Sequence, residues 1–498
     1  MSETVDLFVI GGGINGAGVA RDAAGRGLSV VLCEKDDLAQ GTSSRSGKLV
    51  HGGLRYLEYY EFRLVREALI EREVLLNAAP HIIWPMRFVL PHSPDDRPAW
   101  LVRLGLFLYD HLGGRKKLPG TRVLNLRRDP EGAPIKDAYA KGFEYSDCWV
   151  DDSRLVVLNA RDAVARGAQV MTRTDVLSAT RDGDIWRIET KNTDTGEVTE
   201  HQARMLVNAG GPWVAEIIHN TVRLNSSEGV RLVRGSHIVT RKLYDHDKCY
   251  FFQGTDGRII FAIPYEHDYT LIGTTDKPYD LSEGKVKISP EEITYLCEAA
   301  SEYFENDISP EDVVWTYAGV RPLYDDKSED ASAVTRDYVL DIEEFTEGAP
   351  FLSVYGGKIT TSRKLAEHTM QKLEKYYHYK TGDWTETALL PGGDLIEGDF
   401  ERFVGDMRKR YPALDDAVLR RLCHGYGTRI TLVLGDGDPA PKLGQHFGAG
   451  LYELEANYLI HHEWATSAED ILFRRTKLGL HMSKDEIAGF AEWFDARA

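Results

Sequence analysis

The sequence has few cysteines, and none of them is spaced as a metal ligand or as half of a redox pair. Cys33, Cys148, Cys249, Cys297 and Cys423 are scattered over 498 residues without a CxxC pair. This usage argues against a disulfide scaffold and a zinc site, and it favours a reducing compartment. The histidine pair at His461 lacks a partner at helical spacing, and GDGDPAP breaks the calcium-loop pattern after two acids. We therefore expect no metal.

Long hydrophobic runs are also absent. No stretch of 18 apolar residues occurs, and an apolar run typical of a strand begins as early as Val5. A spanning helix needs about 20 apolar residues, so the sequence predicts none. The early strand leaves no room for a signal peptide, and we expect a protein on the cytoplasmic side of the membrane.

Positive charge is in deficit, with 60 Lys and Arg against 78 Asp and Glu, which gives a formal net charge of -18. Such a surface argues against nucleic-acid binding and repels anionic ligands at long range. Any anion site must therefore be built locally. The length of 498 residues and the 42% apolar content predict a folded chain of two or three domains.

A glycine turn near the start indicates a dinucleotide. Residues 5–10 are typical of a buried strand, Gly11, Gly13 and Gly16 follow as G-x-G-x-x-G, and a helical pattern continues to about Arg26. A second apolar strand ends in Glu34, near the offset at which an acid binds ribose hydroxyls. The helix N-terminus can then bind a pyrophosphate.

The glycine turn serves FAD and NAD alike, so the choice depends on other segments. RMLVNAGGPWV (204–214) and FLSVYGGKITTSR (351–363) are further strands that end in glycines. Ligands bind beyond the carboxyl ends of parallel strands, and three such ends suit a large cofactor such as FAD. The alternative is that both segments are ordinary turns of an α/β sheet.

Two arginines, Arg321 and Arg336, stand on either side of the acidic run YDDKSED. They either pair with these acids, for which a surface pair contributes about 0 to 1 kcal/mol, or bind an anion. Planar guanidinium groups match phosphate oxygens two at a time, so if the pair binds an anion, a phosphate would suit it.

Seven segments, in one order, resemble the FAD-dependent glycerol-3-phosphate dehydrogenases, membrane-associated flavoenzymes of the wider D-amino-acid-oxidase-like group. They are IGGGINGAGVARDAAGRGL, GTSSRSGKLVHGGLRYLE, RGSHIV, IGTTD, AGVRPL, VTRDYVL and VYGGKITTSR. The resemblance implies an α/β fold, with a Rossmann-like FAD-binding domain and an interleaved substrate-binding mixed β-sheet domain in residues 1–392. The charged, helix-patterned residues after LPGG predict an α-helical C-terminal domain, 393–498.

The resemblance also implies which residues bind FAD. They are Gly11, Gly13, Ile14, Asn15, Gly16, Glu34, Thr42, Ser43, Ser44, Ser46, His51, Gly52, Ala209, Gly210, Gly357, Ile359 and Thr360. The hydroxyls and N–H groups of the loop 42–52 suit a pyrophosphate and a polar flavin edge. Without the resemblance, this loop would be an ordinary Ser/Gly-rich surface loop.

The same resemblance implies the substrate residues Arg55, Tyr56, Thr274, Arg321, Arg336 and Lys358, with His237, Arg55 and Lys358 as catalytic residues. His237 would be the general base, because an alcohol must lose a proton as its carbon loses hydride and histidine titrates near working pH. The alternatives are a structural histidine and, for Lys358, a solvated loop lysine.

The implied reaction is oxidation of sn-glycerol 3-phosphate to dihydroxyacetone phosphate, with electrons passing from FAD to membrane quinone. A related oxidase that uses oxygen and a non-catalytic dinucleotide sensor are the alternatives. We expect a homodimer at the cytoplasmic face of the plasma membrane. Residues 98–112 are apolar around most of a helix and precede the basic run 115–128, so residues near 99–128 form either a membrane surface anchor or a core helix.

Overall fold

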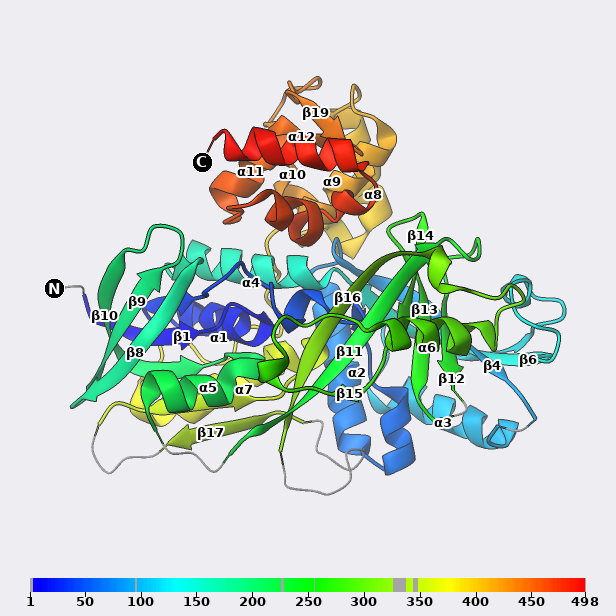
Figure 1. Ribbon diagram of the computed structural model, residues 1–498, viewed down its shortest axis with the longest axis horizontal. Coiled ribbons are helices and arrows are strands. Elements are labelled where there is room, and N and C mark those ends of the chain that lie inside the picture. The colour runs from blue at the N-terminus through cyan, green and yellow to red at the C-terminus, as the bar shows by residue number, and fades with distance from the viewer. Residues whose placement is uncertain are drawn as a thin grey trace.

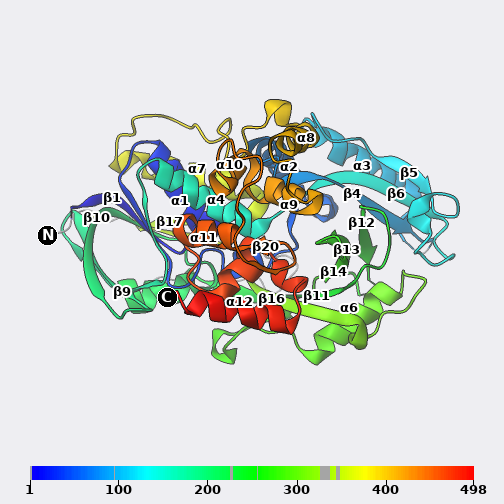
Figure 2. The same ribbon diagram turned by 90° about the horizontal axis from the view of Figure 1, so that it is seen from above.

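The computed structural model describes residues 3–94, 96–224, 228–254, 256–325, 337–343 and 348–497. Two sheets lie side by side, and a helical C-terminal region covers them from one side (Figure 1). From above, this region lies across the junction between the sheets (Figure 2). The α/β fold class with a helical C-terminal region is confirmed.

The first sheet has a parallel centre, in the order β17-β18-β10-β1-β2-β7. Its strands are β1 (Val5–Ile10), β2 (Val30–Cys33), β7 (Gln169–Met171), β10 (Val198–Asn208), β17 (Val339–Glu343) and β18 (Phe351–Tyr355). In β1, Leu7 and Val9 face the cluster that contains the alanines of the first helix, whereas Phe8 and Ile10 face the opposite cluster. Both faces are therefore covered, which explains the continuous apolar run.

Helices cover one face of the first sheet, and a β-hairpin covers the other. The helices on one face are α1 (Ile14–Gly25), α4 (Asp152–Ala165) and α7 (Ser362–Leu373). The hairpin on the other face is formed by β8 (Thr174–Asp182) and β9 (Ile185–Asn192), and β9 continues the sheet antiparallel to the first half of β10.

The second sheet is mostly antiparallel, with one parallel pair between β4 and β12. Its strands are β3 (Leu49–Val50), β4 (Ile83–His92), β5 (Arg122–Asn125), β6 (Lys141–Val150), β11 (Val230–Arg241), β12 (Cys249–Gln253), β13 (Ile259–Tyr265), β14 (Tyr269–Gly273), β15 (Lys277–Pro278) and β16 (Val313–Tyr324). The helices α2 (Phe62–Ala78) and α3 (Ala99–Leu112) contribute to one of its cores, and α6 (Pro290–Ser301) to the other. Because the chain returns repeatedly to both sheets, the two are interleaved.

The C-terminal region has its own hydrophobic core. It contains α8 (Phe400–Arg410), α9 (Asp416–Tyr426), α10 (Ile430–Leu434), the hairpin β19 (His446–Gly448) and β20 (Leu451–Tyr452), α11 (Glu453–His462) and α12 (Lys484–Asp495). Three of these helices have N-cap side chains that accept backbone N–H hydrogen bonds, namely Asp399, Asp415 and Ser483. Such caps each stabilise a helix by about 1 kcal/mol.

Buried ion pairs join the C-terminal region to the first sheet. Asp37, which follows β2, accepts from Arg474 and Arg475, and Arg154 on α4 pairs with Glu463. The second sheet is contacted as well, because the Tyr269 hydroxyl donates to the Leu480 carbonyl at 2.6 Å. Among the described residues, no helix is long and apolar enough to cross a membrane.

Candidate active site

Four strands of the first sheet end beside residues predicted to bind FAD. Gly11 follows β1, Glu34 follows β2, Ala209 follows β10, and the Gly356–Gly357 turn follows β18. These strands are parallel, so their carboxyl ends share one edge of the sheet. Segments more than 340 residues apart thus meet, as the hydrogen bond from Asn15 Nδ2 to the Gly356 carbonyl shows at 3.1 Å.

The glycines of the first turn are required by space and backbone shape. Gly11 has a φ of +108°, which L side chains rarely adopt, and a Cβ on Gly16 would overlap the Gly11 carbonyl oxygen. At Gly13 only Ser43 Oγ lies within 4 Å of a built Cβ. The start of α1 is therefore open to the close approach of a ligand, as a pyrophosphate requires.

Glu34 is held at the end of β2 by two backbone groups. Its carboxylate accepts hydrogen bonds from Gly12 N at 2.6 Å and from Asp36 N at 2.9 Å. Burial raises the pKa of this carboxyl. Carboxylate oxygens have further lone pairs, so this arrangement leaves acceptor capacity for ribose hydroxyls.

The hydroxyls of the loop 42–52 mostly bind the protein itself. Thr42 Oγ1 donates to the Val320 carbonyl at 2.6 Å, Ser43 Oγ accepts from Ile14 N at 3.0 Å, and Ser46 Oγ donates to Asp152 at 2.8 Å. Their first role in this structure is to fix the loop between α1, α4 and β16. The sequence pointed to the loop but did not reveal these partners.

The far end of this loop lies near the turn that follows β18. His51 N donates to Thr360 Oγ1 at 3.2 Å, and Gly52 N donates to the Tyr109 hydroxyl at 2.7 Å. The loop therefore meets the segment that contains Ile359 and Thr360.

A buried polar atom of the first turn is available to a ligand. Asn15 Oδ1 is buried and has no hydrogen-bond partner among the described residues. A buried carbonyl without a partner is costly, so this oxygen is suited to accept from a ligand. Gly210 N already donates to Asn208 Oδ1 at 3.1 Å. The open start of α1 and the unpaired Asn15 oxygen fit FAD.

His237 lies on β11 and is 4% exposed. Its ring stacks on Tyr317 with centroids 4.6 Å apart, and its Nδ1 has no hydrogen-bond partner among the described residues. Burial lowers the pKa of this imidazole well below its ordinary value, and the charges of Arg321 and Lys48 lower it further. His237 is therefore neutral near pH 7 and able to accept a proton.

Arg321 lies on β16, two strand positions beyond Gly319. Its Nη2 donates to Thr274 Oγ1 at 3.0 Å and to the Thr275 carbonyl at 3.1 Å. Its Nη1 lies 3.5 Å from the Asp276 carboxylate. Residues 326–330, which include three of the nearby acids, lie outside the described residues. Arg336 lies outside the described residues.

Arg55, Tyr56 and Lys358 form a second group. Lys358 Nζ lies 4.0 Å from the centroid of the Tyr56 ring, and Arg55 Nη2 lies 3.5 Å from the Tyr59 hydroxyl. This group adjoins the Arg321 strand, because a Cβ built on Gly356 would lie 3.6 Å from the Pro322 carbonyl. The structure thus brings both groups to the same end of the two sheets.

Sequence reasoning missed Lys48, which lies beside the tyrosine ring that stacks on His237. Lys48 is 1% exposed, and its Nζ donates to both Asp152 oxygens and to the Ser44 carbonyl at 3.0 Å. It also lies 5.1 Å from the Tyr317 ring, whose hydroxyl donates to the Ser46 carbonyl at 2.7 Å. A lysine directly before the apolar pair Leu49–Val50 was the available signal for a buried cation.

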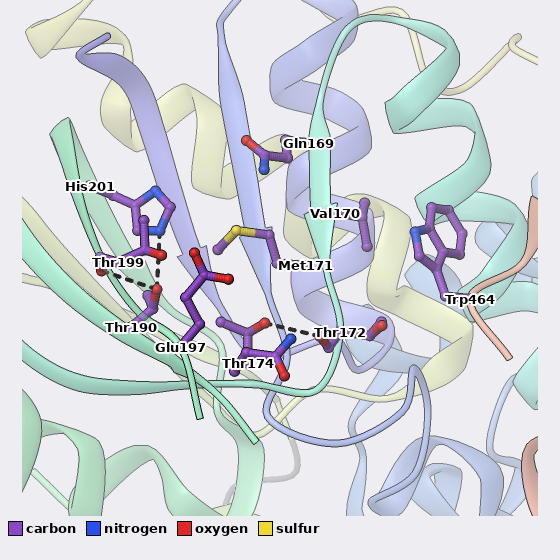
Figure 3. Close-up of a pocket in the computed structure, with 11 residues that line it drawn as sticks. Gln169, Val170, Met171, Thr172, Thr174, Thr190, Glu197, Thr199, His201 and Trp464 are labelled. Atoms are coloured by element: carbon purple, nitrogen blue, oxygen red, sulfur yellow. Dashed lines mark hydrogen bonds between the residues drawn. The ribbon is translucent and has the colours of Figure 1, made fainter. Parts of the chain in front are cut away.

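A cavity of about 390 Å³ lies elsewhere, between β7 and the strands β8 to β10 (Figure 3). Trp464 lines one side of it and His201 another, and His201 Nε2 lies 3.0 Å from Thr190 Oγ1. None of the residues predicted for FAD or substrate lines this cavity, so it is separate from the candidate active site.

Comparisons with known proteins agree with this geometry. Residues 6–363 match the family described as FAD dependent oxidoreductase, and residues 384–490 match the C-terminal domain of alpha-glycerophosphate oxidase. The chain is 60% identical to D-erythritol 1-phosphate dehydrogenase of Brucella abortus (strain 2308), over 99% of this chain and 98% of that protein. It is 50% identical to aerobic glycerol-3-phosphate dehydrogenase of Escherichia coli (strain K12), over 99% and 97%.

A solved structure is also similar. The glycerol-3-phosphate dehydrogenase from Bacillus halodurans, determined in complex with FAD, has 27% identity and a TM-score of 0.76, with 99% of this chain and 94% of that chain covered. Together with the fitting site, these matches establish the family and its cofactor. The chain belongs to the FAD-dependent oxidoreductases of the D-amino-acid-oxidase-like group, is close to the aerobic glycerol-3-phosphate dehydrogenases, and uses FAD.

Proposed function

We propose that this flavoenzyme oxidises a phosphorylated polyol, and that its substrate is sn-glycerol 3-phosphate, which becomes dihydroxyacetone phosphate. The observation that carries the proposal is the hydrogen bond from Arg321 on β16 to Thr274, the residue that follows β14. Both β14 and β16 pair with β11, which bears the neutral, buried His237. A guanidinium for the phosphate and a base for the alcohol are the two groups that this reaction needs.

The proposed roles follow from these positions. Arg321 binds the phosphate oxygens, and Arg336, Arg55 and Thr274 are proposed to assist it. His237 accepts the proton of the hydroxyl on the neighbouring carbon, while FAD, when bound, supplies the acceptor for the hydride. Lys358 brings a positive charge to the same end of the site, over the face of Tyr56. FAD is proposed to contact Gly11, Glu34 and the other residues that were predicted to bind it.

D-erythritol 1-phosphate is a second candidate substrate. It is favoured by the 60% identity with the Brucella abortus enzyme of that name, which exceeds the 50% identity with the Escherichia coli enzyme. Both molecules carry a secondary hydroxyl on the carbon next to the phosphate-bearing carbon, so one arrangement of base and arginine suits both. They differ at the end remote from the phosphate.

We propose further that electrons pass to membrane quinone and that α3 lies on the membrane surface. Trp100, Leu104 and Phe107 on this helix are 68%, 47% and 54% exposed, which disfavours the alternative of a core helix. The basic run after α3 supports this only in part, because Lys116 and Arg127 are exposed whereas Arg122 pairs with buried Glu131 and Glu144. The proposed place is the cytoplasmic face of the plasma membrane.

Two structural proposals accompany the function. Residues 1–392 and 393–498 are proposed to fold as separate domains, which the separate core of the C-terminal region supports. A homodimer is the proposed assembly.

Steady-state turnover with a quinone analogue tests the function. Both phosphorylated polyols are compared with unphosphorylated glycerol as substrates. We expect kcat/KM for glycerol to be lower by at least ~10²-fold, because glycerol lacks two or more of the charged hydrogen bonds that the phosphate makes. Equal use of glycerol would contradict the phosphate site. Peroxide release in place of quinone reduction would indicate the oxidase alternative, and flavin that no polyol reduces would indicate the sensor.

A further inference from the structure

Arg321 and His237, the two proposed functional side chains of the second sheet, each lie against a glycine of that sheet. Gly235 is on β11, and Gly273 is the last residue of β14 and the Cα partner of His237. Neither glycine has a left-handed φ, so neither is required by its φ angle. What each supplies is the space that a side chain would fill.

Gly235 lies under the guanidinium of Arg321. A Cβ built on Gly235 would overlap Arg321 Nη2 and lie 3.1 Å from Cζ and 2.8 Å from Thr274 Oγ1. The hydrogen bond that holds Arg321 to Thr274 therefore occupies the volume that an alanine methyl group would take. Gly235 and Gly319 are Cα partners on β11 and β16, so this space lies over the face of the sheet that both residues share.

Gly273 lies under the ring of His237. A Cβ built there would overlap His237 Cδ2 and lie 2.7 Å from Cγ and 2.8 Å from Nε2. The other side of the ring is closed by Tyr317, which stacks on it with centroids 4.6 Å apart. The ring is thus confined between a glycine and an aromatic side chain.

We propose that Gly235 and Gly273 are positioning residues, Gly235 for the arginine that binds the anionic end of the substrate and Gly273 for the histidine that accepts its proton. This inference rests on the proposed function. Each glycine acts through a different side chain, so the two have different kinetic consequences.

The expected consequences follow from how each side chain can move. The guanidinium is the far end of a flexible chain, so an alanine at 235 displaces it without breaking the fold. Substrate binding weakens while the base remains in place. The His237 ring has no such freedom because Cγ itself would be crowded, so an alanine at 273 forces another rotamer. Proton removal slows while the anion contact remains.

The test compares Gly235→Ala and Gly273→Ala with the parent holoenzyme. Gly229→Ala is the matched control, because a Cβ on Gly229, just before β11, would meet nothing within 4 Å. We expect Gly235→Ala to raise KM by about 10-fold with kcat little changed, and Gly273→Ala to lower kcat by about 10-fold with KM little changed. Gly229→Ala should match the parent.

A double-mutant cycle then separates positioning from a general structural effect. In an Arg321→Ala background, Gly235→Ala should change KM by less than about 2-fold, because the displaced group is gone. Independent effects of the two substitutions would overturn the role of Gly235. A fall of kcat and a rise of KM in the same proportion in both glycine variants would overturn the whole proposal.

A different result would report on the proposed function instead. If neither polyol phosphate reduces the flavin of the parent enzyme, the proposed function is rejected. The proposed positioning of Arg321 and His237 by the two glycines is not rejected by that result. In that case inorganic phosphate is titrated while the flavin absorbance spectrum is recorded. If the parent binds phosphate and Gly235→Ala binds it about 10-fold more weakly, the result supports the role of Gly235 in positioning Arg321. Equal binding, or none in the parent, overturns it.

Discussion

Asp37 tests how the C-terminal region supports the FAD site. Its carboxylate is fully buried and accepts from Arg474 Nε at 2.6 Å and from both terminal nitrogens of Arg475 at 2.7 Å. Arg474 also pairs with Asp470, whereas Arg475 otherwise donates to the Glu463 carbonyl, which carries no charge. Asp37→Asn therefore leaves the Arg475 charge buried without its counter-ion, which costs about 3 to 5 kcal/mol.

The loss of stability should also weaken the binding of FAD, because Asp37 lies three positions after Glu34 in the same turn. Thermal release of FAD, followed by flavin fluorescence, should occur roughly 3 to 5 °C lower in Asp37→Asn than in the parent. Asp182→Asn is the control, since Asp182 pairs with Arg187 on the surface at 57% exposure and should shift the release little. Release at the parent temperature in Asp37→Asn would refute a supporting role for the buried pair.

Four further predictions concern the active site and α3. Arg321→Ala should lower kcat/KM for the phosphorylated substrate at least ~10-fold in steady-state assays with FAD retained, and unchanged kinetics would contradict phosphate binding. The neutral form of His237 is the active one and its pKa is lowered, so flavin reduction at saturating substrate should stay level as pH falls through 6.5. His237→Ala should slow that reduction by ~10²-fold in stopped-flow traces, and a parental rate would mean that another group takes the proton. Leu104→Asp with Phe107→Asp should abolish salt-sensitive binding to anionic liposomes and keep the protein folded, whereas aggregation of the double variant would indicate a core helix.

Much of the first sheet could be predicted because its signals are local. The apolar strand before Gly11, the glycine spacing and the acid at Glu34 lie within about 30 residues, and each has a direct physical reason. The site residues beyond them depended on a family resemblance. Apart from Arg336, which lies outside the described residues, the structure places them at the carboxyl end of the first sheet and on the adjoining second sheet. Their roles toward ligands are still predictions.

The remainder depends on long-range pairing that one sequence does not reveal. His237 meets Gly273 and Tyr317 only because β11 pairs with both β14 and β16 in that register. Periodicity also could not distinguish a core helix from a membrane surface anchor at α3, because the sequence of α3 is apolar around most of the helix and fits either one. The buried pair of Lys48 and Asp152 joins residues 104 positions apart, which no local pattern indicates.

Anaerobic titration of the parent holoenzyme with sn-glycerol 3-phosphate tests the central claim most directly. The proposed function predicts that the yellow flavin absorbance is lost as substrate is added and that dihydroxyacetone phosphate forms in equal amount. D-erythritol 1-phosphate added in a parallel titration shows which of the two substrates is bound more tightly. Flavin that stays oxidised with both phosphorylated polyols would contradict the account.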